Sequence, residues 1–154
     1  MNNLITNGDF ATQALEPWES NSQQPPVFEP VKDTTGAYGL RIEPSTEIRQ
    51  LIGQTDPTPF RLKWQFSARI DSRAHLGAAV AVLFTARSGQ KYYLDISVTH
   101  ELTDDWQTFS HTGITEFPAD HEGLYVQIIS ARKAGETGPS SAPVHVTGIS
   151  ASYQ

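Results

Sequence analysis

Apolar and polar residues alternate along most of this chain with a period of two. The clearest case is the segment 60–70, in which every second residue is apolar, including Leu62, Trp64 and Phe66, and polar residues such as Gln65 stand between them. Successive side chains of a β-strand point to opposite faces, so the pattern predicts a strand with one buried and one solvent-facing side. Similar alternation occurs in the segments 38–42, 92–98, 124–128 and, more weakly, 106–111.

The segment 78–86 contains alanine and leucine, which favour a helix by propensity. Val80, Val82 and Phe84 nevertheless occupy alternate positions, and Ser88-Gly89 provides a turn into the next alternating segment. We therefore predict a β-hairpin here rather than a helix.

Turn signals occur throughout the chain, because its 11 glycines and 10 prolines are spread out. The segment 17–30 is polar and interrupted by prolines, so we expect a long surface loop or an irregular edge there. No window holds an amphipathic helix longer than about two turns. Short strands separated by turns roughly every 8–12 residues indicate one all-β domain over residues 1–154, an antiparallel β-sandwich of the jelly-roll type.

The amino-acid composition argues against several classes of function. The formal net charge of −6 and the absence of a basic cluster argue against nucleic acid as a partner. Because cysteine is absent, a disulfide, a thiolate nucleophile and a cysteine-ligated metal are excluded. No apolar segment approaches the roughly 20 residues that span a bilayer. The first residues show no secretory signal, and the localisation stays unknown.

Several motifs occur in the order typical of one group of carbohydrate-binding modules. Asn-Gly-Asp-Phe at 7–10 is followed by Pro17-Trp18, and the other matching segments are 36–42, 48–52, 60–66 and 106–109. Together they resemble the jelly-roll modules of the xylan- and glucan-binding group, within the galactose-binding-like fold. The resemblance implies a lectin-like, non-catalytic protein that binds a polysaccharide or oligosaccharide.

The same resemblance implies a structural calcium ion, with Asp9 as a metal ligand. In the family a glutamate often follows Asn-Gly-x-Phe, and one or two aspartates lie in the final strand. Here Ala11 follows Phe10, and the residues 145–149 read His-Val-Thr-Gly-Ile. Calcium takes about six to eight oxygen ligands, typically including carboxylates. The anionic ligand set is therefore depleted, and we expect that no cofactor is required.

Sugar recognition needs aromatic faces for the C–H surfaces of pyranose rings and planar polar groups for pairs of hydroxyls. In a jelly roll, such groups can stand on the outer face of one sheet or at the loop tips. The candidates on the solvent-facing sides of the predicted strands are Gln65, Arg69, Tyr93, Asp95, Tyr125 and Gln127. Tyr93 and Tyr125 are the most informative, because each places a ring in a polar face. The alternative for both tyrosines is packing beneath loops or in cross-strand pairs.

The remaining chemistry-bearing residues favour structural roles. Trp64 shares the phase of Leu62 and Phe66, which places it in the core, and we expect Trp18 and Trp106 to be structural too. The five histidines lack the i, i+2 or i, i+4 spacing of a metal site. No serine lies in a nucleophile motif.

Two alternatives to sugar binding stay open. A stand-alone jelly roll could be a protein-interaction or toxin-accessory domain that pairs through its edge strands or forms a homo-oligomer. A small hydrolase would need carboxylates at the roughly 5–10 Å separation of glycoside hydrolysis, which one sequence does not fix. Our prediction is non-catalytic carbohydrate binding.

Overall fold

The chain consists of β-strands and loops in the part that the computed structural model describes, which is residues 3–32, 35–53, 60–71, 78–88, 91–115, 123–132 and 142–153. The strands are β1 (Glu19–Ser20), β2 (Phe28–Pro30), β3 (Tyr38–Ile42), β4 (Glu47–Gly53), β5 (Phe60–Ile70), β6 (Ala78–Ser88), β7 (Lys91–Glu101), β8 (Gln107–Thr115), β9 (Gly123–Arg132) and β10 (Val144–Tyr153). Within these residues, nothing forms a helix of the length and apolarity needed to cross a membrane.

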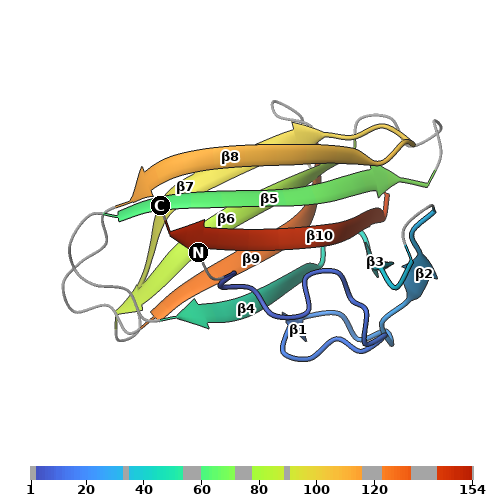
Figure 1. The fold of residues 1–154 in the computed structure, drawn as a ribbon, viewed down its shortest axis with the longest axis horizontal. Helices are drawn as coiled ribbons and strands as arrows, with labels where there is room; N and C mark the ends of the chain where they lie inside the picture. Colours follow the sequence, from blue (N-terminus) through green and yellow to red (C-terminus); the bar gives the residue numbers. More distant parts are fainter. Residues whose placement is uncertain are drawn as a thin grey trace.

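The strands form two five-stranded antiparallel sheets that pack face to face (Figure 1). We call them the first sheet, with the order β1-β4-β9-β6-β7, and the second sheet, with the order β2-β3-β10-β5-β8. Only the pairs β2–β3 and β6–β7 are consecutive strands within one sheet, so nearly every connection crosses between the two layers. The predicted antiparallel β-sandwich is confirmed.

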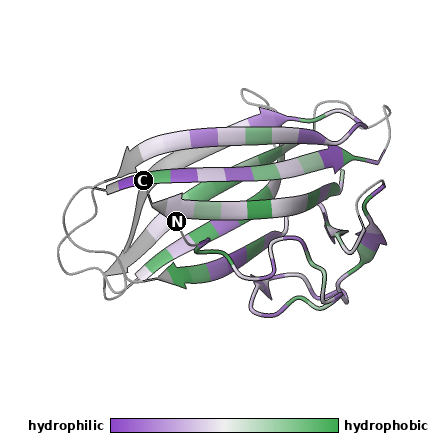
Figure 2. Ribbon diagram, viewed as in Figure 1, coloured by the Kyte–Doolittle hydropathy of each residue, from purple (hydrophilic) through white to green (hydrophobic). Residues whose placement is uncertain are grey.

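Alternate side chains fill the space between the sheets. On β5, Leu62, Trp64 and Phe66 are at most 4% exposed, whereas Lys63 and Gln65 between them are exposed. Figure 2 shows the alternation of hydrophobic and hydrophilic residues along this strand. The core position predicted for Trp64 is confirmed, and so is the structural role of Trp18, which is 2% exposed and donates its indole N–H to the carbonyl of Asn7 at 3.1 Å.

The β6–β7 hairpin predicted from alternation is confirmed, because Ser88 pairs with Lys91 and the ladder continues from there. The register shifts once along the hairpin, between Phe84 and Thr85. Phe84 pairs with Ile96 and Thr85 pairs with Leu94, so Asp95 lies at the shift. A register shift of this kind reverses the face to which the following residues belong.

The N-terminal segment is hydrogen-bonded to the last part of β10. The Leu4 N–H donates to the Ala151 carbonyl at 2.7 Å, and the Ile149 N–H donates to the Gly8 carbonyl at 3.1 Å. Gly8 lies so close to β10 that a Cβ atom there would stand 1.9 Å from the Ile149 carbonyl oxygen. This backbone contact explains why the Asn-Gly motif needs glycine at its second position.

Replacing Gly8 by alanine is therefore expected to lower the free energy of unfolding by about 3 kcal/mol, because the added methyl meets backbone atoms that cannot rotate away. Denaturant unfolding of Gly8→Ala beside the control Thr6→Ala, an exposed position in the same segment, measures the effect. The control should stay within about 0.5 kcal/mol of the wild type. Equal stability of the two variants would contradict the close contact.

Two histidines meet where the edge strands β7 and β8 approach each other. The Nε2 atoms of His100 and His111 are 2.6 Å apart, and the rings stack on Phe109 at 4.0 Å and on Trp64 at 5.3 Å, respectively. Burial and the neighbouring His111 lower the pKa of His100 from its ordinary value of 6.5. Below that value the unfolded chain takes up a proton more readily than the folded chain does. The stability that depends on neutral His100 is therefore present above the unfolded pKa and is lost as the pH falls.

The wild type should accordingly lose more free energy of unfolding between about pH 7 and pH 5 than His100→Phe does. Phenylalanine keeps an aromatic ring against Phe109 and removes the titrating group. Paired denaturant unfolding series at the two pH values provide the comparison. An equal or larger loss in His100→Phe would contradict the lowered pKa.

Candidate functional site

The outer face of the first sheet carries three rows of side chains that neighbour one another across β4, β9 and β6. Directly paired residues in a sheet point to the same side, so strand register defines the rows. The rows are Leu51, Tyr125 and Thr85; Arg49, Gln127 and Leu83; and Glu47, Ile129 and Ala81. The residues between them on β9, such as Val126 and Ile128, are buried between the sheets. We call the surface formed by these nine residues the Tyr125 face.

An aromatic ring with an apolar neighbour occupies one end of the Tyr125 face. Tyr125 is half-buried, and the paired Leu51 is 54% exposed. The guanidinium carbon of Arg49 lies 5.9 Å from the centre of the Tyr125 ring, within the range of a cation–π contact. Arg49 also donates from Nε to Glu19 at 3.2 Å, which connects β4 to β1. The ring is thus supported by charged and apolar groups while part of it stays accessible.

Planar polar groups follow in the next two rows. The Gln127 side-chain amide donates from Nε2 to Glu47 Oε2 at 2.9 Å, and the Thr85 hydroxyl donates to Gln127 Oε1 at 3.4 Å. Both contacts fix the orientation of the amide. Toward β1 the surface is hollowed by a cavity of about 220 Å³, lined in part by Glu19, Glu47 and Arg49.

This arrangement suits a ligand that has both C–H surfaces and hydroxyl groups. The Tyr125 ring and Leu51 offer apolar contact area, whereas Gln127, Glu47 and Arg49 offer donors and acceptors in planar groups. These groups would hold a ligand by stacking and hydrogen bonding, which are reversible contacts. Such a surface can hold a sugar ring, and the hollow beside Glu47 gives room for a neighbouring ring of the same chain.

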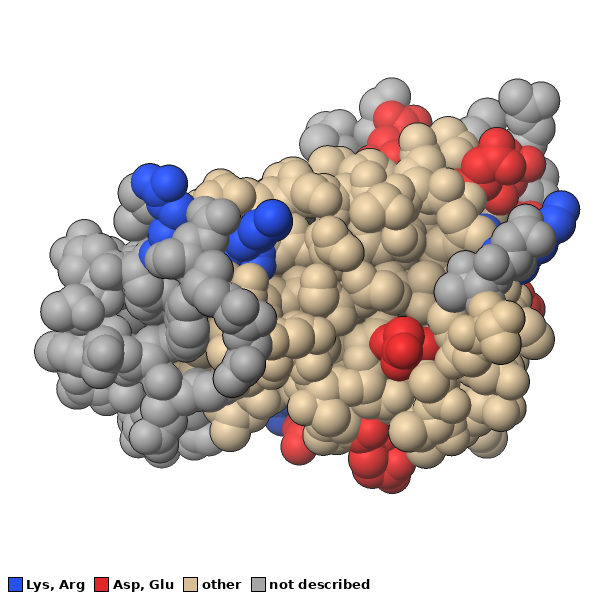
Figure 3. All heavy atoms as spheres, viewed as in Figure 1, with Lys and Arg blue, Asp and Glu red and all other residues tan. Residues whose placement is uncertain are grey.

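The six residues predicted to bind the ligand do not all lie on one face of the structure. Tyr125 and Gln127 lie together on the Tyr125 face. Gln65 and Arg69 belong to β5 in the second sheet, on the opposite side of the sandwich, so the six residues do not share one face. That opposite face is the one toward the reader in Figure 3, and charged side chains are sparse over its middle.

Arg69 takes part in contacts within the protein. Its Nη2 donates to Glu29 at 3.0 Å, and its Nη1 donates to the carbonyl of Ile70 at 3.2 Å. The guanidinium carbon lies 5.3 Å from the centre of the Trp106 ring, and that ring packs on Gly39. Trp106 is half-buried, and it links β3 to β5.

Tyr93 and Asp95 are described in their backbone only, and their side chains lie outside the described part of the chain. Tyr93 pairs with Ala86, and Ala86 pairs in turn with Leu124, which is a core residue. The register shift at Asp95 separates Tyr93 from Ile96. The alternation from which the outward phase of Tyr93 was predicted is therefore not continuous along β7.

The described groups around Asp9 supply few of the ligands that a calcium ion takes. Asp9 Oδ1 accepts the N–H of Ala11 at 3.2 Å, and the Asp9 carbonyl accepts the N–H of Tyr38 at 2.9 Å. The hydroxyl of Thr147, on the final strand, donates to the Tyr38 carbonyl at 2.8 Å. Asp9 is the only carboxylate among these groups, whereas calcium takes about six to eight oxygens with several carboxylates. Across the described residues, no three His, Cys, Asp or Glu side chains converge on one point that could hold a metal.

Sequence reasoning missed the contribution of β4 to the Tyr125 face, which comes from Glu47, Arg49 and Leu51. Ile48 and Ile52 lie on the buried side of β4, but the polar Gln50 between them interrupts the alternation of apolar and polar residues that would have predicted it. Gln50 is only 4% exposed because its side-chain amide bonds to the backbone of Thr6, accepting at 2.8 Å and donating at 2.9 Å.

Comparison with known proteins gives a consistent result. A family model described as a carbohydrate binding domain matches residues 2–139. Similar solved structures include TmCBM61 in complex with β-1,4-galactotriose, with 14% identity, 100% of both chains covered and a TM-score of 0.65. The CBM22-1 xylan-binding domain of Paenibacillus barcinonensis Xyn10C has 10% identity, with 99% of this chain and 94% of that chain covered and a TM-score of 0.70. A CBM4 module has 18% identity, with 97% and 99% covered and a TM-score of 0.60. No protein of curated function matches the chain.

Proposed function

The chain belongs to the family of carbohydrate-binding domains, and we propose that it binds a saccharide chain on the Tyr125 face without catalysing a reaction on it. The observation that carries this proposal is the half-buried Tyr125 ring beside the fixed Gln127–Glu47 pair on the outer face of the first sheet. Family membership supports the class of ligand, and the row register supports the location.

Binding would proceed by two kinds of contact. One pyranose ring lays its C–H surface on Tyr125 and Leu51, where burial of apolar area favours association. The hydroxyls of that ring and the next one bond to Gln127, Glu47 and Arg49. Because the site lies on the outer face of a sheet, few of these contacts would be fully shielded from water. We therefore expect a dissociation constant on the order of μM to mM for each site.

The choice of probes follows from the structural neighbours. One neighbour is described in complex with β-1,4-galactotriose and another as a xylan-binding domain, so galactan and xylan are natural ligands to test, together with soluble glucans. Affinity electrophoresis in gels that contain each polysaccharide measures the interaction directly. We expect at least one polysaccharide to slow the migration of the folded protein relative to a non-binding reference protein.

The non-catalytic part of the proposal has its own test. Incubation with the same polysaccharides, followed by a reducing-end assay, should release no sugar above the background. Unchanged migration in all of the gels, with the protein folded, would contradict the binding proposal. Release of reducing ends would instead contradict the absence of catalysis.

A further inference from the structure

We propose that a second ligand site, a pocket at the side of the sandwich, binds a single pyranose ring. The pocket lies between the segment 20–26, which crosses from β1 to β2, and the turn that crosses from β3 to β4. None of the nine residues of the Tyr125 face lines it, although Ser20 lines both this pocket and the hollow beside Glu47.

The floor of the pocket is apolar. Leu40, Ile42 and Ile48 are each 2% exposed, and Leu15 and the two prolines at 25–26 complete the apolar wall. Leu40, Ile42 and Ile48 are covered, so the accessible C–H surfaces, of the kind that contact the less polar face of a sugar ring, come from Leu15 and the two prolines. The cavity measures about 220 Å³, less than the roughly 300–1,000 Å³ of pockets for drug-sized ligands. Its size suits one ring rather than an extended chain.

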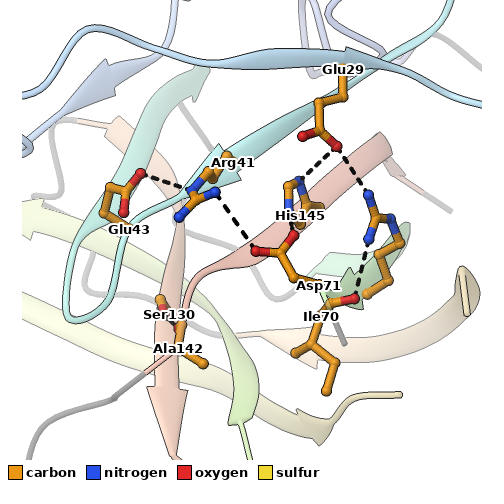
Figure 4. A network of polar contacts seen from close by, with 9 residues as sticks. Glu29, Arg41, Glu43, Ile70, Asp71, Ser130, Ala142 and His145 are labelled. Atoms are coloured by element: carbon orange, nitrogen blue, oxygen red, sulfur yellow. Dashed lines mark hydrogen bonds and ion pairs between the residues drawn. The ribbon is translucent and has the colours of Figure 1, made fainter. Parts of the chain in front are cut away.

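Arg41 and Glu43 also line the pocket, and they form an ion pair. Arg41 Nε bonds to Glu43 Oε1 at 3.0 Å, and Arg41 Nη1 lies 3.7 Å from Asp71 Oδ2 (Figure 4). Both side chains of the Arg41–Glu43 pair are about one third exposed. The hydrogen bond between the two side chains uses Arg41 Nε and Glu43 Oε1. A donor and an acceptor thus stand side by side, which is the pattern that two neighbouring sugar hydroxyls require.

The orientation of Arg41 is set by a chain of contacts behind it. Asp71 bonds to Nε2 of His145, which is fully buried, and Nδ1 of His145 lies 3.8 Å from Glu29 (Figure 4). Burial raises the pKa of Asp71, but the hydrogen bond and charge of His145, with the charges of Arg41 and Arg69, outweigh it and leave the pKa below its ordinary value. The carboxylate facing Arg41 therefore stays ionised at neutral pH. A guanidinium held in this way loses less side-chain freedom when a ligand binds.

Methyl-detected NMR tests the pocket with free D-xylose, D-glucose and D-galactose as probes. We expect saturable shifts at Leu15 and Ile48 with at least one of the three sugars, in the wild type and equally in Tyr125→Ala. Glu43→Gln should weaken this binding roughly tenfold, because it replaces the charged acceptor of a hydrogen bond. Ser22→Phe, which keeps the charged pair and adds a ring at the wall of the pocket, should also weaken it.

Glu16→Gln is the matched control, because Glu16 is exposed and lies outside the pocket. It should bind as the wild type does. No shift at Leu15 and Ile48 with any of the three sugars would overturn the proposal, as would wild-type affinity in both Glu43→Gln and Ser22→Phe. Failure of the polysaccharide gels with these shifts intact would instead remove the function proposed for the Tyr125 face and leave the pocket in place.

Discussion

Replacing Trp64 by alanine is expected to lower the free energy of unfolding by about 3–5 kcal/mol. Trp64 is 4% exposed, and its ring meets the Phe84 ring edge-on at 5.0 Å and stacks on His111 at 5.3 Å. Phe84 belongs to the first sheet and Trp64 to the second, so the indole joins the two layers. Removing it leaves a cavity that the surrounding strands can fill only in part.

The neighbouring Lys63 provides the matched control for Trp64. It lies one position away on β5 and is exposed, so Lys63→Ala should change the free energy of unfolding by no more than about 0.5 kcal/mol. Trp64→Phe should fall between the two, because phenylalanine fills part of the space. Denaturant unfolding of the three variants gives the order directly. A Trp64→Ala protein as stable as Lys63→Ala would mean that the indole does not lie between the sheets.

The largest functional effect is expected from Tyr125→Ala. It should weaken binding of the polysaccharide that slows the protein in gels by about tenfold to a hundredfold. That range corresponds to roughly 1.4–2.8 kcal/mol of lost stacking and apolar contact. Because Tyr125 is half-buried on an outer face, the same change should cost little stability. Quantitative affinity electrophoresis measures the binding, and thermal unfolding of the same preparations reports the fold.

Two variants sharpen the Tyr125 experiment. Tyr125→Phe keeps the ring and should retain most of the affinity, which separates stacking from the hydroxyl. Gln65→Ala removes an exposed amide from the opposite sheet and should leave the affinity unchanged. If Gln65→Ala lost binding and Tyr125→Ala did not, the ligand would occupy the second sheet instead.

The strands of this fold could be predicted from local patterns, because each pattern depends on the sequence of one segment. The alternation around Trp64 assigned the core side of β5, and Ser88-Gly89 marked the connection within the β6–β7 hairpin. Burial of one face is enough to set the phase of such a strand. The order of the strands in each sheet has no comparable local signal.

The candidate site depends on that strand order, which is why only part of it could be predicted. Gln65 and Gln127 both stand on solvent-facing sides, yet nearly every connection crosses between layers and places them on opposite faces. Arg49 and Gln127 are 78 positions apart in the chain and become direct neighbours only through the pairing of β4 with β9. Buried polar groups such as Gln50 and His145 break the apolar patterns, because their bonding partners come from distant segments.

The most direct test of binding on the Tyr125 face is a methyl-detected NMR titration of the wild type. The ligand is an oligosaccharide derived from the polysaccharide that slows the protein in gels. We expect saturable shifts at Leu51, Leu83 and Ile129, the leucine and isoleucine members of the Tyr125 face, and their loss in Tyr125→Ala. Unmoved signals at these three residues, with saturable shifts at the Gln65 side-chain amide on the other sheet, would contradict binding on the Tyr125 face.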